Sequence, residues 1–379
     1  MTEIQERKWD VIIVGTGMGG GTLGRALAEK GWSVLFLEKG RRGFRCEQQG
    51  LSPSITEPSA RMVRGAWPDK VSGRVNGRDH AFFAALGCGV GGSSVFYAGT
   101  LERPEPRDLD HSAEAPHPSG GWPFSWQEFS PWLEAAEEMY GVHRPPGMAC
   151  SEHVQSKTLK LISLEDEAIM QRLRSNRCHP YILGSSVLAT EGCMSCLGKK
   201  CPRQCKMDAR SAGVEPALAT GNCYLLDQCE VLSVQGTENR VSHVEAMYKG
   251  QKIQLQAGCF VLAAGALNSP RIMLASRSSS WPQGCGNAHD LVGRNLMFHL
   301  DEMFVVWPPS KQRSNVPSKS VGLRDFYTVQ GRRLGMIQAM GLNANYGEIV
   351  HFLKEWMLSR GWSSMAKAAP LIGLPVSRL

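Results

Sequence analysis

The stretch "DVIIVGTGMGGGTLGRALAEKGWSVLFLEKG", residues 10–40, decides the fold of this chain. It begins with a short β-branched run, "DVIIVG", passes through a glycine-rich turn into a segment with apolar residues at helical spacing, and ends in a second apolar run, "SVLFLE". Strand, glycine turn, helix and strand in this order are typical of dinucleotide-binding units. The sequence therefore predicts an α/β fold, Rossmann-like, with a buried parallel sheet.

The glycines of this turn have separate roles in such a unit. Gly15 permits the tight bend, Gly17 lets a diphosphate approach the backbone, and Gly20 lets the helix pack closely on the strand. Thr16 lies between the first two and is predicted to contact the cofactor with them. Glu38, at the end of the second strand, is placed to accept hydrogen bonds from both ribose hydroxyls, and its charge disfavours the 2′-phosphate of NADP. This motif alone does not distinguish FAD from NAD.

Composition indicates a globular protein of about two domains. The chain has 379 residues, of which 42% are apolar and 20% charged. Its formal charge of +7 is spread along the chain, so we expect no nucleic-acid partner. We find no apolar run long enough for a transmembrane segment, and the polar start lacks the apolar core of a secretory signal. We expect a cytoplasmic protein whose twelve cysteines are thiols or metal ligands.

A second glycine cluster makes the resemblance to one family specific. The stretch "GCGVGGSSVFYAGTLERPEPRD", residues 87–108, resembles the first signature of the glucose-methanol-choline (GMC) oxidoreductases, which are FAD enzymes that oxidise alcohols. Gly91 and Gly92 suit a close approach of backbone N–H groups to the diphosphate and the flavin ring. The hydroxyls of Ser93 and Ser94 suit donation to phosphate or ribityl oxygens.

Further positions follow from the same resemblance. Tyr97 stands near the ring position, where the family often has Asn. The stretch "CFVLAAGALNSPRIMLASR", residues 259–277, is similar to the second signature, and it places Ala264 and Gly265 beside the cofactor. The adenine-contacting backbone position of the family corresponds to Val231.

The resemblance implies a discontinuous arrangement of two domains. We expect a Rossmann-like FAD-binding domain from residues 1–110 and 200–300. It is interleaved with an α+β substrate or cap domain from residues 111–199 and 301–379, which lacks its C-terminal part relative to the family pattern.

The resemblance also implies a reaction. In the family, a C-terminal His takes the alcohol proton while hydride passes to flavin N5. None of the ten histidines stands in the matching context, and His299 and His351 are interpreted as surface or packing residues, so we assign no catalytic base.

We predict an FAD-dependent oxidoreductase that acts on the CH–OH group of an alcohol, sterol or sugar, with oxygen, a quinone or a cytochrome as electron acceptor. One alternative is a flavin-binding fragment or subunit that lacks the His base. Another, an NAD-dependent dehydrogenase, explains only the first motif.

The segment "CMSCLGKKCPRQC" carries four cysteines, namely Cys193, Cys196, Cys201 and Cys205. Four thiolates within thirteen residues suit one iron–sulfur cluster better than zinc, whose two ligand pairs usually flank a longer loop. We interpret the four cysteines as structural thiols or as the ligands of an iron–sulfur cluster, which is a candidate second cofactor, with zinc as a further alternative.

Overall fold

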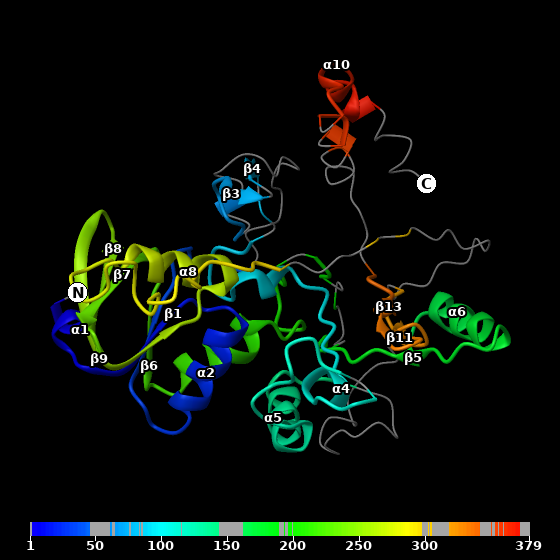
Figure 1. Cartoon of the computed structure of the whole chain (residues 1–379), viewed down its shortest axis with the longest axis horizontal. Helices are drawn as coiled ribbons and strands as arrows, with labels where there is room; N and C mark the ends of the chain where they lie inside the picture. Colours follow the sequence, from blue (N-terminus) through cyan, green and yellow to red (C-terminus); the bar gives the residue numbers. More distant parts are fainter. Residues whose placement is uncertain are drawn as a thin grey trace. The chain divides into compact units, whose positions relative to one another are not determined.

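The computed structural model (Figure 1) describes residues 2–45, 61–62, 65–75, 77–82, 84, 86–114, 116–143, 162–188, 193, 196–198, 200–297, 302, 304, 318–341, 350, 353–354, 356–358 and 360–371. Its contacts divide the chain into two compact units. The first unit contains Met1–Phe96, Gly213–Leu296 and Asn343–Leu379, and the second contains Tyr97–Ala212 and Met297–Leu342.

These boundaries differ from the domain boundaries that the sequence predicts. Residues 97–110 and 200–212, predicted in the FAD-binding domain, lie in the second unit. The reason is local pairing, because Thr100 and Lys206 form backbone bridges to residues Ser185 and Val187 of the second unit. The assignment of FAD to one domain and substrate to the other stays a prediction.

The first unit is built on a six-stranded sheet of order β6-β2-β1-β9-β8-β7. Its strands are β6 (Cys223–Leu226), β2 (Val34–Leu37), β1 (Trp9–Val14), β9 (Gln251–Leu262), β8 (Arg240–Tyr248) and β7 (Cys229–Thr237). The first four strands are parallel, and β8 and β7 continue the sheet as an antiparallel meander. The predicted Rossmann-like α/β fold is therefore confirmed.

The two faces of β1 and β2 belong to different parts of the core. Alternate residues of a strand point to opposite faces, so Val11 and Ile13 pack with Phe36 on one side, whereas Ile12 packs with Leu35 on the other. Helices α2 (Met18–Ala28) and α7 (Glu215–Ala219) pack on the side of Val11, Ile13 and Phe36. Helix α8 (Gly265–Ala275) packs on the side of Ile12 and Leu35. Since both faces are covered, Val11–Val14 of β1 and the whole of β2 are apolar and buried.

Two glycines let helix α2 lie close to its neighbours. A β-carbon on Gly24 would be 2.1 Å from the Cζ atom of Phe36. A β-carbon on Gly213 would be 2.6 Å from the carbonyl carbon of Gly21. Helix and strand therefore pack at a distance that only glycine permits at these positions.

In its described part, the first unit also contains the short elements α1 (Thr2–Glu6), the hairpin of β3 (Val71–Val75) and β4 (Arg78–Phe82), the 3₁₀ turn η1 (Gly92–Phe96) and α10 (Ser363–Ala366).

The second unit combines short helices with small antiparallel sheets. Its helices are α4 (Pro106–Leu109), α5 (Trp126–Met139), α6 (Leu164–Ser175) and most of the π-helix η3 (Ala209–Val214). Its strands are β5 (Tyr181–Ile182), β10 (Val321–Leu323), β11 (Thr328–Val329), β12 (Arg332–Arg333) and β13 (Ile337–Gln338). Strand β10 lies between β13 and β5, and β11 pairs with β12.

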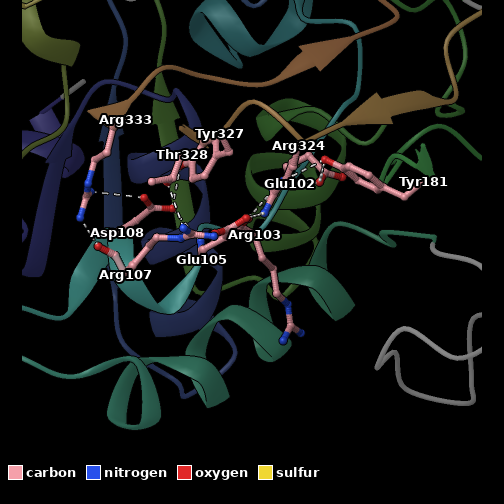
Figure 2. Close-up of polar contacts among 10 residues, drawn as sticks. All are labelled: Glu102, Arg103, Glu105, Arg107, Asp108, Tyr181, Arg324, Tyr327, Thr328 and Arg333. Atoms are coloured by element: carbon pink, nitrogen blue, oxygen red, sulfur yellow. Dashed lines mark hydrogen bonds and ion pairs between the residues drawn. The ribbon is translucent and has the colours of Figure 1, made fainter. Parts of the chain in front are cut away.

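Polar contacts join the segment around α4 to the strands of residues 321–333, as Figure 2 shows. The Arg324 guanidinium donates to Glu102 at 3.1 Å and to the Tyr181 hydroxyl at 3.0 Å. The Tyr327 hydroxyl donates to Asp108 at 2.8 Å. Segments more than 200 residues apart in sequence are thus held together by half-buried ion pairs and hydrogen bonds.

We expect Gly24→Ala to lower the free energy of unfolding by about 1–3 kcal/mol, because the added methyl group must displace the buried Phe36 ring. The matched control is Gly19→Ala on the same helix, where a β-carbon meets no atom within 4 Å. The control should raise stability by up to about 1 kcal/mol through helix propensity. Urea unfolding measures both variants, and equal effects would contradict the packing described for α2.

Candidate functional site

The carboxyl end of β1 leads directly into the glycine turn. Gly15 has φ +97°, and its N–H donates to the carbonyl of Leu37 at 2.8 Å, so the turn is fixed to the end of β2. A β-carbon on Gly15 would be 2.5 Å from the carbonyl oxygen of Ala263, at the end of β9. A β-carbon on Gly20 would be 2.1 Å from the carbonyl oxygen of Gly15. This geometry agrees with a tight bend at Gly15 and with close packing of the helix on the strand at Gly20, while their contacts with a cofactor stay a prediction.

Gly17 is different, because it faces open space. It is the N-cap residue of α2, and a β-carbon there would meet no atom within 4 Å. No side chain caps this helix end, and no acidic residue lies in its first turn. A helix N-terminus presents N–H groups and the positive end of the helix dipole. This end of α2 therefore suits an anionic group such as a diphosphate.

Glu38 follows β2 and is buried, with 7% of its surface exposed. Its carboxylate accepts hydrogen bonds from the Thr16 hydroxyl at 2.6 Å, from the Thr16 N–H at 3.2 Å and from the Gly40 N–H at 2.9 Å. Burial raises the pKa of Glu38, and these donors oppose that effect. The carboxylate therefore holds the turn after β1, while its contact with a ribose stays a prediction.

The second glycine cluster lies against the same turn. The Gly91 N–H donates to the Thr16 hydroxyl oxygen at 3.2 Å. A β-carbon on Gly92, which has φ +55°, would be 3.0 Å from the α-carbon of Gly17. A β-carbon on Gly40 would be 2.2 Å from the carbonyl carbon of Cys88. Two glycine-rich segments about 75 residues apart thus form one continuous backbone surface.

The two serines of this cluster are engaged with the backbone. The Ser94 hydroxyl is buried and donates to the Gly91 carbonyl at 2.6 Å. Ser93 is exposed, and its hydroxyl oxygen accepts from the Gly87 N–H at 2.9 Å. The Ser94 hydroxyl therefore stabilises the loop. The Ser93 hydroxyl acts as an acceptor in its bond to Gly87, so its own hydrogen is still available to donate. Their predicted contacts to FAD are not tested by this geometry.

The remaining predicted positions of the first unit lie near the same sheet edge. Ala264 is the N-cap of α8, and its N–H donates to the Ser269 hydroxyl at 3.0 Å. Gly265 has φ +80°, and a β-carbon there would meet no atom within 4 Å. Val231 is buried in β7, whose first N–H, that of Cys229, donates to the carbonyl of Glu38. This hydrogen bond places the start of β7, and with it Val231, close to Glu38, although β7 and β2 are not adjacent in the sheet.

Tyr97 begins the second unit. Its hydroxyl lies 2.5 Å from the Ser186 hydroxyl and donates to the carbonyl of Met207 at 2.7 Å. Burial raises the pKa of Tyr97 well above its usual range. The predicted contact of Tyr97 with the flavin stays a prediction.

The cysteine segment does not form the predicted metal centre. All four predicted ligands are among the described residues, and no group of three or more His, Cys, Asp or Glu side chains there could hold a metal ion. Cys196 and Cys201 pair with each other through a sulfur–sulfur hydrogen bond, and Cys201 also accepts from backbone N–H groups. Close spacing in sequence brings the Cys196 and Cys201 sulfurs together, but among the described residues no three of these cysteines form a group that could hold a metal. The iron–sulfur prediction is not supported.

Two of the histidines that the sequence analysis considered, His299 and His351, lie outside the described residues. Among the described helices, none is both long enough and apolar enough to cross a membrane.

The sequence matches the family model of GMC oxidoreductase over residues 9–301, more than half of the chain. The chain belongs to the GMC oxidoreductases. The matched range contains β1, the glycine turn, Glu38, the second glycine cluster and α8.

Two GMC relatives illustrate the similarity. Paromamine 6'-oxidase of Streptomyces fradiae is 27% identical over 329 residues, which are 79% of this chain and 56% of the relative. Fructose dehydrogenase large subunit of Gluconobacter japonicus is 26% identical over 321 residues, which are 76% of this chain and 58% of the relative. The chain thus spans just over half the length of these relatives.

Solved structures show a more distant similarity. Pyridoxine 4-oxidase from Mesorbium loti gives a TM-score of 0.46 at 19% identity, over 71% of this chain and 52% of that chain. The Aspergillus oryzae formate oxidase gives a TM-score of 0.49 at 17% identity, over 72% of this chain and 48% of that chain.

Two residues that shape the GMC site are absent from the sequence predictions. Gly40 allows the approach of Cys88, and Gly213 allows the approach of Gly21 to the π-helix. Gly40 ends the run "EKG", two residues after Glu38. A glycine this close to the acid was the sequence signal that could have indicated a close backbone approach. Gly213 lies in a helical segment with no turn signal, so only the structure identifies it.

We expect Thr16→Val to lower the free energy of unfolding by about 1–3 kcal/mol, since it removes the buried hydroxyl that donates to Glu38 and accepts from Gly91. Thr22→Val is the control, because the Thr22 hydroxyl donates to the Met18 carbonyl of its own helix. The control should change stability by less than about 0.5 kcal/mol. Urea unfolding of the three chains measures the difference, and a Thr16 variant as stable as the control would contradict the role of this hydroxyl.

Proposed function

We propose that the chain is an FAD-dependent oxidoreductase that acts on CH–OH donors and binds the ADP half of FAD on its first unit. The observation that carries this proposal is the open helix end at Gly17. Neighbouring backbone leaves no room for a side chain at Gly15 or Gly20, whereas no atom of the described residues excludes a side chain at Gly17. At the uncapped N-terminus of a helix, a glycine that the fold itself does not require supports a ligand that needs the space.

The residues around this helix end fit the parts of FAD. The uncapped N–H groups of α2 and the backbone of Gly92 would hold the diphosphate. Glu38, which follows β2 next to the turn, would accept from the ribose hydroxyls. The backbone of Val231 would contact the adenine, and Ala264 and Gly265 would lie beside the flavin half. When bound, FAD supplies the two-electron acceptor for oxidation of an alcohol.

The substrate is proposed from the relatives by class only. The names of the relatives include a fructose dehydrogenase, a 2-methyl-1,2-propanediol dehydrogenase and a cholesterol oxidase. Sugars, small alcohols and sterols share the CH–OH group on which we propose that this chain acts. We propose that the second unit contributes to substrate binding, and that oxygen, a quinone or a cytochrome reoxidises the cofactor.

A binding titration with FAD tests the cofactor proposal. We expect the chain to bind FAD with an absorbance band near 450 nm, and Gly17→Val to weaken binding by at least about tenfold, because its side chain fills the space beside the helix end. Gly73→Val is the control, since Gly73 in β3 also has no atom within 4 Å of a β-carbon. Both variants should fold, so weaker FAD binding by Gly17→Val alone would assign the effect to the ligand site. Equal FAD affinity in all three chains would overturn the proposal.

Anaerobic addition of alcohols to the FAD-bound chain then tests the reaction. Loss of the 450 nm band with a sugar, sterol or small alcohol supports the proposed oxidoreductase. A chain that binds FAD and is reduced by none of these classes would instead support the flavin-binding fragment or subunit without a His base.

A further inference from the structure

A small group of bridged segments in the second unit brings several polar side chains to one face. Ser185 pairs with His143, and the two residues exchange both backbone hydrogen bonds, at 2.7 and 3.1 Å. Residues directly opposite each other in such a pair project their side chains to the same side. Val187, two residues from Ser185, pairs with Lys206, so the Lys206 side chain projects to this side as well.

Lys319 reaches the same face from the segment before β10. Its backbone is fixed, because the N–H groups of Lys319 and Ser320 donate to Asp166 at 3.0 and 2.9 Å. Its ammonium group donates to the Ser185 hydroxyl oxygen at 3.3 Å. Lys319 is 8% exposed, so this charge lies almost entirely out of solvent.

Within the described residues, the ammonium group of Lys319 has no acidic partner. An ammonium group carries three N–H donors, and among the described residues only the Ser185 hydroxyl lies within hydrogen-bond distance of it. Burial and the neighbouring Lys206 lower the pKa of Lys319 to about 8, and no carboxylate raises it. Lys206 differs, since Asp208 raises its pKa and the carbonyls of Tyr97 and Cys196 accept from it.

His143 adds a second unmatched group beside Ser185. Its Nε2 atom is buried and has no hydrogen-bond partner in the described part of the chain. Burial lowers the pKa of His143, which keeps the ring neutral with a donor available on one nitrogen. A buried polar atom without a partner is costly and indicates that a partner is supplied from outside the protein.

We propose that Lys319 and His143, which both lie next to Ser185, form a binding site for a small oxyanion, a carboxylate or a phosphate group. The two unmatched donors of Lys319 and the Nε2–H of His143 would donate to its oxygens. A negative charge would compensate the ammonium, which is costly to bury alone. Hydrogen bonds between charged groups are shorter and stronger than neutral ones. An anion bound here would therefore pair with the Lys319 ammonium and would also accept from the His143 ring. This site does not depend on flavin binding.

Isothermal titration of the full chain at pH 7 tests this site, with sodium phosphate and sodium acetate as probes and sodium chloride at matched ionic strength as the reference. We expect phosphate, acetate or both to bind the wild-type chain, and the preferred probe identifies the oxyanion class. Lys319→Met should weaken binding by at least about tenfold, because it removes the charged donor. The control Lys252→Met changes an exposed lysine of β9 and should leave binding unchanged.

A second variant protects the test against misfolding. His143→Phe keeps a ring at this position and removes the Nε2 donor, so it should weaken binding while the far-ultraviolet circular dichroism stays that of the wild type. Absence of phosphate and acetate binding by the wild-type chain would overturn the proposal. Equal affinity in the wild type, Lys319→Met and His143→Phe would also overturn it, since binding would then lie elsewhere.

Discussion

The hydrogen bonds of the buried Glu38 carboxylate fix the arrangement on which the candidate site depends. A carboxylate this deeply buried is costly unless donors surround it, and Thr16 and Gly40 provide them. Thr16 in turn accepts from Gly91 in the second glycine cluster. The carbonyl of Glu38 also accepts from Cys229 at the start of β7. One residue therefore connects the turn after β1, a distant loop and the outer strand of the sheet.

This arrangement explains why the site is formed mainly by backbone. The backbone around Gly15 and Gly20 leaves no room for a side chain at either position, and the backbone of Gly92 lies close to that of Gly17. The surface that results presents N–H groups at the end of α2, with few side chains in front of them. Backbone donors on a rigid sheet suit an anionic cofactor, because their orientation is set by the fold and costs little to maintain on binding.

The first motif was predictable from sequence because local order encodes it. The positions of Gly15, Gly17, Gly20 and Glu38 follow from the strand, turn, helix and strand that surround them, and the parallel sheet confirms that fold. The bond from Thr16 to Gly91 joins residues 75 positions apart, and spacing alone could not reveal it. Likewise, the spacing of the cysteines predicted proximity, yet it could not show that Cys196 and Cys201 pair while, among the described residues, no three of the cysteines form a group that could hold a metal. Side-chain partners depend on tertiary packing, which local patterns do not contain.

The central claim is that the first unit recognises the ADP half of FAD through α2 and Glu38. Competition of ADP and of FMN with bound FAD tests this claim most directly. The chain is saturated with FAD, and displacement is followed by flavin fluorescence as ADP or FMN is added at equal concentration. ADP should displace FAD, and FMN, which lacks the adenosine and the second phosphate, should be much weaker. Displacement by FMN but not by ADP would contradict the account.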